Sequence, residues 1–202
     1  MPGLSDLTRL GKIWFHADVN ATKSPEVFEK IVVDMPSSGY VARFLSIASV
    51  VEDVVKIGPL AEEARLINQY FSNPRHARLH LATVLEDLII TESMEFYHQI
   101  ANARSVEFGC IFINRAMPEI FDNLIDLDLE RSEKLPPTIG AIIAMFKERR
   151  LEERLQRGRL AKGAISLPEV VITDLPGEDK EAKIVEHMIE ELLIGPIFSI
   201  LF

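Results

Sequence analysis

A carboxylate followed by a turn of small residues is the best candidate for a reactive group in this sequence. Asp34 closes the apolar run 31–33, and the residues at 36–39 read Pro-Ser-Ser-Gly. Open α/β sheets bind ligands at such turns, at the carboxyl ends of their strands. An aspartate there can hold a water molecule bound to magnesium. It can equally cap the turn or helix that follows, which is a purely structural role.

Other groups that could do chemistry are weaker candidates. His76 and His80 are four residues apart, but they flank a strand pattern, and on a strand this spacing does not bring side chains together. Cys110 lies inside an apolar run, which predicts a buried, inert thiol. Glu86 and Glu92 could belong to a carboxylate set, although the favourable charge of a helix start explains Glu86 more simply.

The composition limits the classes of protein and partner. Of the 202 residues, 48% are hydrophobic, and the formal net charge is -9. This acidity argues against a nucleic-acid-binding protein and against a polybasic membrane anchor. The single cysteine excludes an intrachain disulfide framework. No apolar run reaches the roughly 18 residues of a membrane span, and the first residues do not form a signal peptide. We therefore expect a cytoplasmic protein.

The elements that must position Asp34 alternate between strands and helices. Strands are predicted at 29–34, 77–84, 107–115 and 164–172, and helices at 4–16, 40–56, 60–72, 86–104, 136–162 and 179–194. This alternation predicts one α/β domain, residues 1–202, with a mostly parallel sheet and flanking helices. Within the helix at 136–162, the apolar part 139–146 is expected in the core, with one wall of a client or partner surface as the alternative. The charged part 147–159 is expected on a solvated face. The apolar carboxyl end is expected to dock on the core or on a partner.

Five stretches, in order along nearly the whole chain, resemble the ArsA/GET family of anion-transporting and tail-anchored-protein-targeting ATPases. The stretch from Asp34 to Tyr40, DMPSSGY, resembles the family's D-A-P-x-T-G-H, which ends a strand. The other four are PGLSDL at 2–7, LATVLEDLIITES at 81–93, IFINRAMP at 111–118 and ISLPEV at 165–170. The resemblance implies part of a P-loop NTPase fold that uses ATP and Mg²⁺.

The resemblance assigns catalytic roles to the first of these stretches. Asp34 would lie at the second switch and reach Mg²⁺ through a water molecule, near the attacking water. Ser37, Ser38 and Gly39 would form the switch turn that senses the γ-phosphate. Tyr40 stands where the family has a histidine, and a tyrosine does not titrate near neutral pH as a histidine does.

The resemblance also assigns the nucleotide-base contacts. Asn114 would hydrogen-bond the adenine edge, which suits an amide with an acceptor and two donors. Arg115 and Pro168 would lie near the base. The C-x-x-C zinc pair of the targeting branch is absent from this sequence, so a zinc-bridged dimer is not expected.

The phosphate-binding loop of such enzymes is missing. No G-x-x-x-x-G-K-[ST] occurs in the chain, and in the family this loop lies upstream of the region matched. Hydrolysis is therefore expected only if an upstream region or a partner chain supplies a P-loop. The partner would be an ArsA-like ATPase chain or a second copy, and a membrane-protein client stays open. The alternatives are a regulatory or dimer-completing subunit without activity, and an unrelated α/β binding domain.

Overall fold

A parallel five-stranded sheet forms the centre of the protein. The computed structural model describes residues 3–17, 28, 30–35, 38–103, 105–122, 136–163, 165–173 and 198–201. The strands are β1 (Ile31–Asp34), β2 (Ala77–Val84), β3 (Glu107–Ala116), β4 (Glu169–Thr173) and β5 (Phe198–Leu201). Their order is β1-β5-β2-β3-β4, and every neighbouring pair is parallel. The predicted α/β class with a parallel sheet and flanking helices is thereby confirmed.

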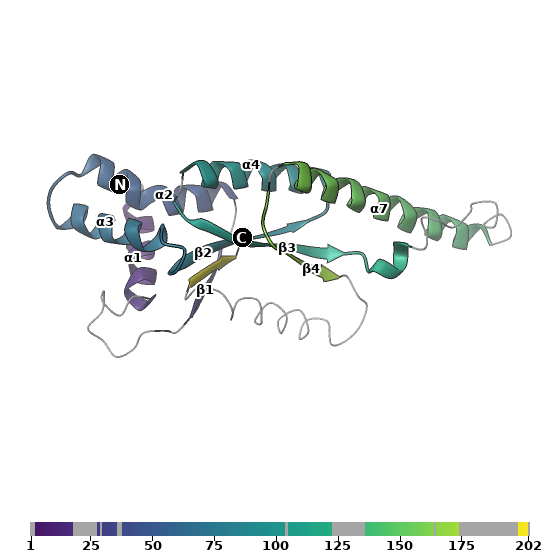
Figure 1. Ribbon diagram of the computed structural model, residues 1–202, viewed down its shortest axis with the longest axis horizontal. Helices are drawn as coiled ribbons and strands as arrows, with labels where there is room; N and C mark the ends of the chain where they lie inside the picture. Colours follow the sequence, from purple (N-terminus) through teal and green to yellow (C-terminus); the bar gives the residue numbers. More distant parts are fainter. Residues whose placement is uncertain are drawn as a thin grey trace.

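The helices occupy the sequence between the strands, as the alternation predicted. They are α1 (Leu4–Ala17), α2 (Ser38–Val54), α3 (Pro59–Phe71), α4 (Asp87–Ala103) and α7 (Pro137–Lys162), with a short 3₁₀ turn at Glu119–Phe121. Prolines at the start of α3 and α7 favour helix initiation there, because the first turn needs no N–H donor from that residue. In Figure 1, α2, α4 and α7 lie in a row along one side of the sheet, and α1 and α3 lie near the β1 end.

The strand β5 was not predicted. The sequence indicated four strands and an apolar carboxyl end that docks on the core or on a partner, whereas residues 198–201 enter the sheet between β1 and β2. Phe198 pairs with Ile31 on one side and with Ala77 on the other, and Leu201 pairs with Asp34 and His80. Without β5, the inner edges of β1 and β2 would both lack this partner. The backbone pairing thus joins β1 to the rest of the sheet.

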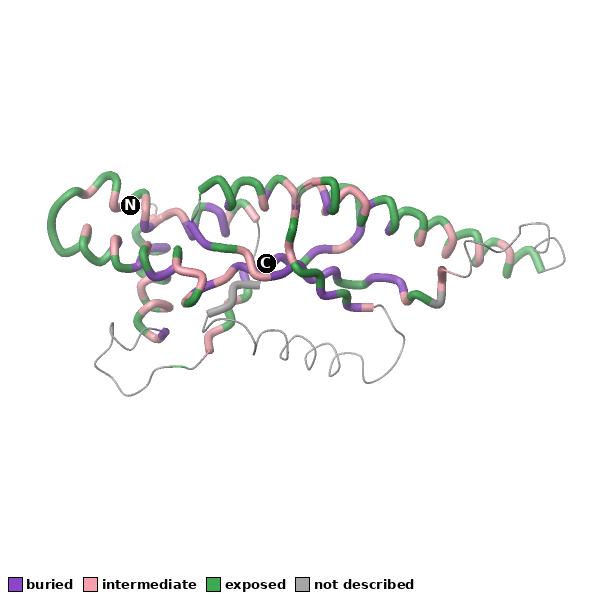
Figure 2. The backbone as a smooth tube through the Cα atoms, in the orientation of Figure 1, coloured by how far each residue is buried: buried purple, intermediate pink, exposed green. Residues whose placement is uncertain are grey.

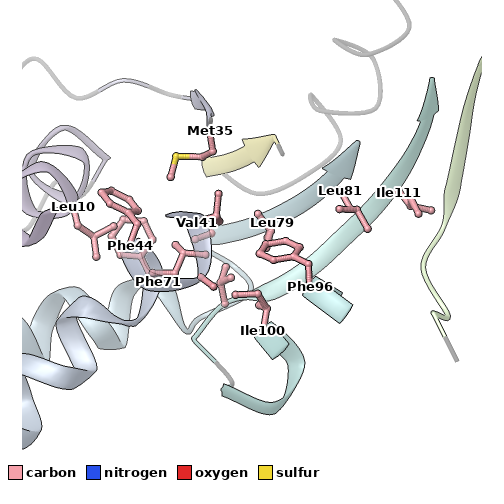
Figure 3. Close-up of a cluster of buried hydrophobic side chains, with 14 of the residues drawn as sticks. Leu10, Met35, Val41, Phe44, Phe71, Leu79, Leu81, Phe96, Ile100 and Ile111 are labelled. Carbon is pink, nitrogen blue, oxygen red and sulfur yellow. The ribbon is translucent and has the colours of Figure 1, made fainter. Parts of the chain in front are cut away.

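The main core lies between the sheet and the helices. Leu79, Leu81, Ile111 and Ile113 of the two longest strands are at most 2% exposed. Figure 3 shows these strands meeting side chains of the surrounding helices, among them Leu10, Val41, Phe44, Phe71, Phe96 and Ile100. Burial of each such side chain contributes about 1.5–3 kcal/mol. Figure 2 shows the same distribution as a buried band along the sheet and the inward faces of the helices.

The opposite face of β3 and β4 carries a smaller buried cluster. Cys110, Phe112, Val170 and Ile172 form it. Successive side chains of a strand point to opposite faces, so Phe112 belongs to this cluster while its neighbours Ile111 and Ile113 face the helices. The near-continuous apolar run in β3 follows from this burial on both faces.

For the long helix α7, the expected core position of the apolar part was wrong, and the expected solvated face was confirmed only in part. Its apolar first part is largely exposed, since Ile139 and Ile142 are 43% and Met145 58% exposed. Its charged second part is not simply solvated, because Glu153 and Gln156 are 4% and 2% exposed and pack toward the sheet. The predicted helix at 179–194 and most of the predicted loop at 17–27 lie outside the described residues. In the part of the chain that the structure describes, no helix is both long and apolar enough to cross a membrane.

Candidate functional site

The two principal candidate residues, Asp34 and Asn114, lie at the same edge of the sheet. Asp34 ends β1, and Asn114 lies near the carboxyl end of β3, paired with Val84 at the end of β2. Because the strands are parallel, their carboxyl ends share one edge. Three strand spacings separate β1 from β3, about 14 Å, and Asn114 lies four residues, about 13 Å, beyond the level of Asp34 along the strands. A ligand that contacts both must be extended and must pass the ends of β5 and β2.

The Asp34 side chain is exposed at the strand end. It makes no hydrogen bond or ion pair with the described residues, and residues 36 and 37 of the turn that it could cap lie outside them. Ser38 begins α2 and Gly39 is exposed in its first turn, close to Asp34 in sequence. An exposed carboxylate is a hard oxygen ligand of the kind that Mg²⁺ and its bound waters accept.

Tyr40 joins α2 to α1. Its hydroxyl donates a hydrogen bond to Asp6 Oδ1 at 3.0 Å, and Arg9 Nη1 donates to the same hydroxyl at 3.1 Å. Its ring stacks on Phe44, with ring centroids 5.8 Å apart. Asp6 is 7% exposed, so this hydroxyl satisfies a buried carboxylate. Tyr40 therefore holds two helices together.

Asn114 and Arg115 form a tight bend at the end of β3. The backbone N–H of Arg115 donates to Asn114 Oδ1 at 2.9 Å, and Arg115 has a φ of 55°. This left-handed conformation is uncommon outside glycine and asparagine. The Arg115 carbonyl accepts a hydrogen bond from Arg149 of α7 at 3.0 Å. The bend uses the amide oxygen of Asn114 and leaves its NH₂ group available as a donor.

Two cavities lie beside this bend, between the strand ends and α7. The first, about 310 Å³, is lined by charged groups that include Arg115, Arg149 and Glu86. The second, about 470 Å³, is lined by apolar side chains, among them Ile113, Met117 and Val171, and by charged groups that include Arg150 and Glu153.

A buried ion network connects α7 to the segment after β3. Glu153 is 4% exposed and accepts hydrogen bonds from the Met117 N–H at 3.1 Å and from Arg150 Nη1 at 3.2 Å. Arg150 also donates to both carboxylate oxygens of Asp122, at 2.7 and 3.0 Å. Its hydrogen bond, with the charge of Arg154, lowers the pKa of Asp122 to about 2. The sequence did not lead us to predict this network. The helical spacing of residues 150, 153, 156 and 160, which places them on one face of α7, was the available signal.

Pro168 is not near Asn114. It precedes β4, and its carbonyl accepts a hydrogen bond from the Ile111 N–H at 2.9 Å. Asn114 lies three residues further along β3, about 10 Å toward the carboxyl edge. The structure therefore brings Arg115, but not Pro168, close to Asn114. Glu86 lies in the first cavity, beside Arg115.

His80 and Cys110 form a buried pair on the opposite face of the sheet. His80 Nδ1 lies 2.9 Å from Cys110 Sγ and accepts the Cys110 N–H at 3.3 Å. These contacts place the ring proton on Nε2, which is buried and has no hydrogen-bond partner among the described residues. Gly109 leaves room for the ring, since a Cβ there would clash with it. Burial, followed by the charge of Arg78, lowers the pKa of His80 to about 4. The buried Cys110 predicted from the sequence is confirmed.

The lowered pKa of His80 predicts a loss of stability in acid. The unfolded chain binds a proton with a pKa near 6.5, whereas the folded chain resists it. The stability that depends on a neutral His80 is therefore intact above pH 6.5 and is lost as the pH falls toward 4. The total loss is about 3 kcal/mol in the free energy of unfolding. Urea unfolding at pH 7 and pH 4 measures the loss. His80→Gln should remove most of it, and His98→Gln, on the exposed surface of α4, should leave it unchanged. An equal acid loss in His80→Gln would contradict the assignment.

Comparison with known proteins adds the following. No family model matches the chain. The chain is 34% identical over 119 residues to the protein named ATPase BagA of Mycobacterium tuberculosis, and to the "Putative ATPase Mb3704" of Mycobacterium bovis. Each match covers 58% of this chain and 34% of the relative. The chain thus spans about a third of the length of these relatives.

Proposed function

We propose that the chain is part of an ArsA-like ATPase. In this proposal it contributes the second switch and the base-contacting edge of an Mg-ATP site, and an upstream region or a partner chain contributes the P-loop. The observation that carries the proposal is the position of Asp34 and Asn114 at the carboxyl ends of parallel strands, on one edge of one sheet. The similarity to proteins named as ATPases supports the same class.

The residues present are compatible with the two groups that such an enzyme needs. The exposed carboxylate of Asp34 would hold a water molecule bound to Mg²⁺ and orient the water that attacks. The free NH₂ of Asn114 would donate to a ring nitrogen of the base, and the second cavity beside it would take the ring. Bound Mg-ATP supplies the phosphoryl group and the metal charge that stabilises its transfer. Asp34, Ser38 and Gly39 would contact the phosphate end of the nucleotide. Asn114 and Arg115 would contact its base.

A second candidate is a regulatory or dimer-completing subunit without activity of its own. The strand β5 favours it, because β5 fills the space between β1 and β2 and pairs with both strands. A sheet completed in this way needs no further strand from a P-loop-bearing chain. In this case the chain would bind such an ATPase through its surface and change the partner's turnover.

One experiment separates the two candidates. The intact mass of the natural product in its source cells shows whether an upstream region is attached. Binding of a fluorescent ATP analogue is then measured for the natural product, and for the 202-residue chain with and without a P-loop-bearing ATPase of the same cells. Nucleotide binding that needs both parts and is weakened by a change at Asn114 supports the first candidate. Altered partner turnover that is insensitive to changes at both Asn114 and Asp34 supports the second.

The Asn114 contact gives a specific prediction for nucleotide affinity. Asn114→Asp keeps the oxygen that accepts the Arg115 N–H and removes the NH₂ donor, so the bend should persist while the base contact is lost. We expect ATP affinity in the complete assembly to fall about tenfold, the value of one hydrogen bond in a desolvated site. Titration calorimetry measures it. Asn102→Asp, exposed on α4, is the matched control, and an unchanged ATP affinity in Asn114→Asp would remove Asn114 from the site.

A further inference from the structure

A groove between α1 and β1 combines positive charge with apolar surface. Its volume is about 490 Å³. Four basic and four apolar residues line it: Arg9, Lys12, His16, Lys30, Ile13, Phe28, Ile31 and Val32. Among the described residues that line the groove, none is a carboxylate, although the chain as a whole has a net charge of -9.

The basic residues of α1 lie on one helix face. Arg9, Lys12 and His16 are spaced by three and four residues, which places them side by side along the helix. Arg9 is partly neutralised by Asp6, whose Oδ1 lies 3.5 Å from Arg9 Nη1. Lys12 is exposed. The groove therefore offers a row of basic side chains to a ligand that carries negative charge.

The apolar part of the groove is held in place while exposed to solvent. Phe28 is 58% and Val32 is 49% exposed. The Phe28 N–H donates to the His16 carbonyl at 3.2 Å, and the two rings meet edge to face with centroids 5.8 Å apart. These contacts fix an apolar surface next to the basic side chains. A ligand that covers it would remove this surface from water.

The strand β1 borders the groove and lies at the end of the sheet. One edge of β1 pairs with β5, and its other edge has no strand partner among the described residues. An unpaired strand edge is a template for another extended chain. Ile31 and Val33 pack toward the main core, on the side of α1, whereas Val32 is exposed on the opposite face.

We propose that the groove binds an extended peptide segment of a partner protein, which adds as a strand to the free edge of β1. Side chains of an added strand alternate between its two faces. Acidic side chains at alternate positions would face the basic side chains of α1, and apolar side chains between them would lie beside Val32. The backbone hydrogen bonds would give affinity, and the charge pattern would select the partner. The proposal is independent of ATP.

The test uses a short fluorescein-labelled peptide of alternating valine and glutamate, with anisotropy as the readout. The full 202-residue chain should bind it at neutral pH, and added salt should weaken the binding. The double change Lys12→Glu and Lys30→Glu should weaken it by roughly tenfold or more. The matched control is Lys56→Glu with Lys162→Glu, which alters the net charge equally at exposed positions outside the groove.

Two peptide variants test the binding mode without altering the protein. A valine–lysine peptide should not bind, because it meets like charge. A valine–glutamate peptide with N-methylated backbone should not bind, because it cannot pair with a strand edge. Binding of either variant as tightly as the parent would overturn the proposal, and so would no binding of the parent. Dimerisation of the chain, seen by sedimentation and reversed by the parent peptide, would assign the groove to self-association and would overturn the proposal as well.

Discussion

Replacement of Asp34 by asparagine is expected to reduce ATP turnover of the complete assembly by roughly 100-fold or more, with little change in nucleotide affinity. Asparagine has the same size, so the strand end and the start of α2 should keep their positions. It lacks the negative charge that would hold a magnesium-bound water and orient the attacking one. Steady-state phosphate release measures turnover, and titration with a fluorescent nucleotide measures affinity.

Asp53→Asn is the matched control for this prediction. Asp53 lies near the end of α2, and its side chain is 84% exposed, so its replacement should change neither turnover nor affinity. If Asp34→Asn turns over ATP at the normal rate, Asp34 has no role in the reaction. In that case the capping role remains its explanation, and the regulatory candidate gains support.

Replacement of Glu153 by alanine is expected to lower the free energy of unfolding by about 3–5 kcal/mol, the usual cost of removing one partner of a buried ion pair. The change leaves Arg150, whose side chain is 13% exposed, with Asp122 alone. It also leaves the Met117 N–H without its acceptor. Urea unfolding monitored by circular dichroism measures the loss.

The control for Glu153 is Glu148→Ala, on an exposed position of the same helix, which should change stability by less than about 0.5 kcal/mol. Glu153→Gln keeps one acceptor oxygen and should lose less than alanine does. Because Glu153 fixes the segment that follows Asn114 and Arg115, the alanine variant should also bind ATP more weakly in the assembly. A stability equal to that of Glu148→Ala would show that the network contributes nothing to folding.

Much of the fold could be predicted because local patterns and packing agree. The strand at 77–84 is confirmed at both ends, and the strand at 107–115 is extended by one residue, to Ala116. Both are buried on the helix-facing side and bounded by turn residues. The helices α2 and α3 were separated correctly at Gly58, where a φ of 109° interrupts the helical pattern. The helix predicted at 4–16 is confirmed as α1, which extends to Ala17.

The features that the sequence did not reveal depend on contacts distant in the chain. The four residues of β5 pair with strands far upstream, and nothing in their local pattern specifies those partners. The burial of Glu153 is decided by Met117 and Arg150, because a paired carboxylate can be buried where an isolated one cannot. The same run of alternating charges would occur on a fully solvated helix, so the pattern by itself does not indicate that Glu153 is buried.

The candidate site was predictable in part. Asp34 was predicted from the end of its apolar run, whereas Asn114 was assigned through the resemblance, and parallel pairing lies behind their position at one edge. The distance between Asp34 and Asn114 depends on the strand order, and β5 changes that order by lying between β1 and β2. Pro168 was assigned to the same site through the resemblance alone, and the register of β4 against β3 places it toward the other end of the sheet.

The position of β5 also determines how late in biosynthesis β1 can pair with its neighbour in the sheet. Its residues are synthesised after every other described strand and helix, yet its neighbour β1 is made near the beginning. At about 5–20 residues per second, residue 201 follows residue 31 after on the order of 10 s. During this interval the nascent chain can assemble β2, β3 and the helices packed on them. The edge of β1 that pairs with β5 in the folded protein stays unpaired. A chaperone that protects exposed strand edges on the ribosome should therefore contact β1 until translation reaches the residues of β5.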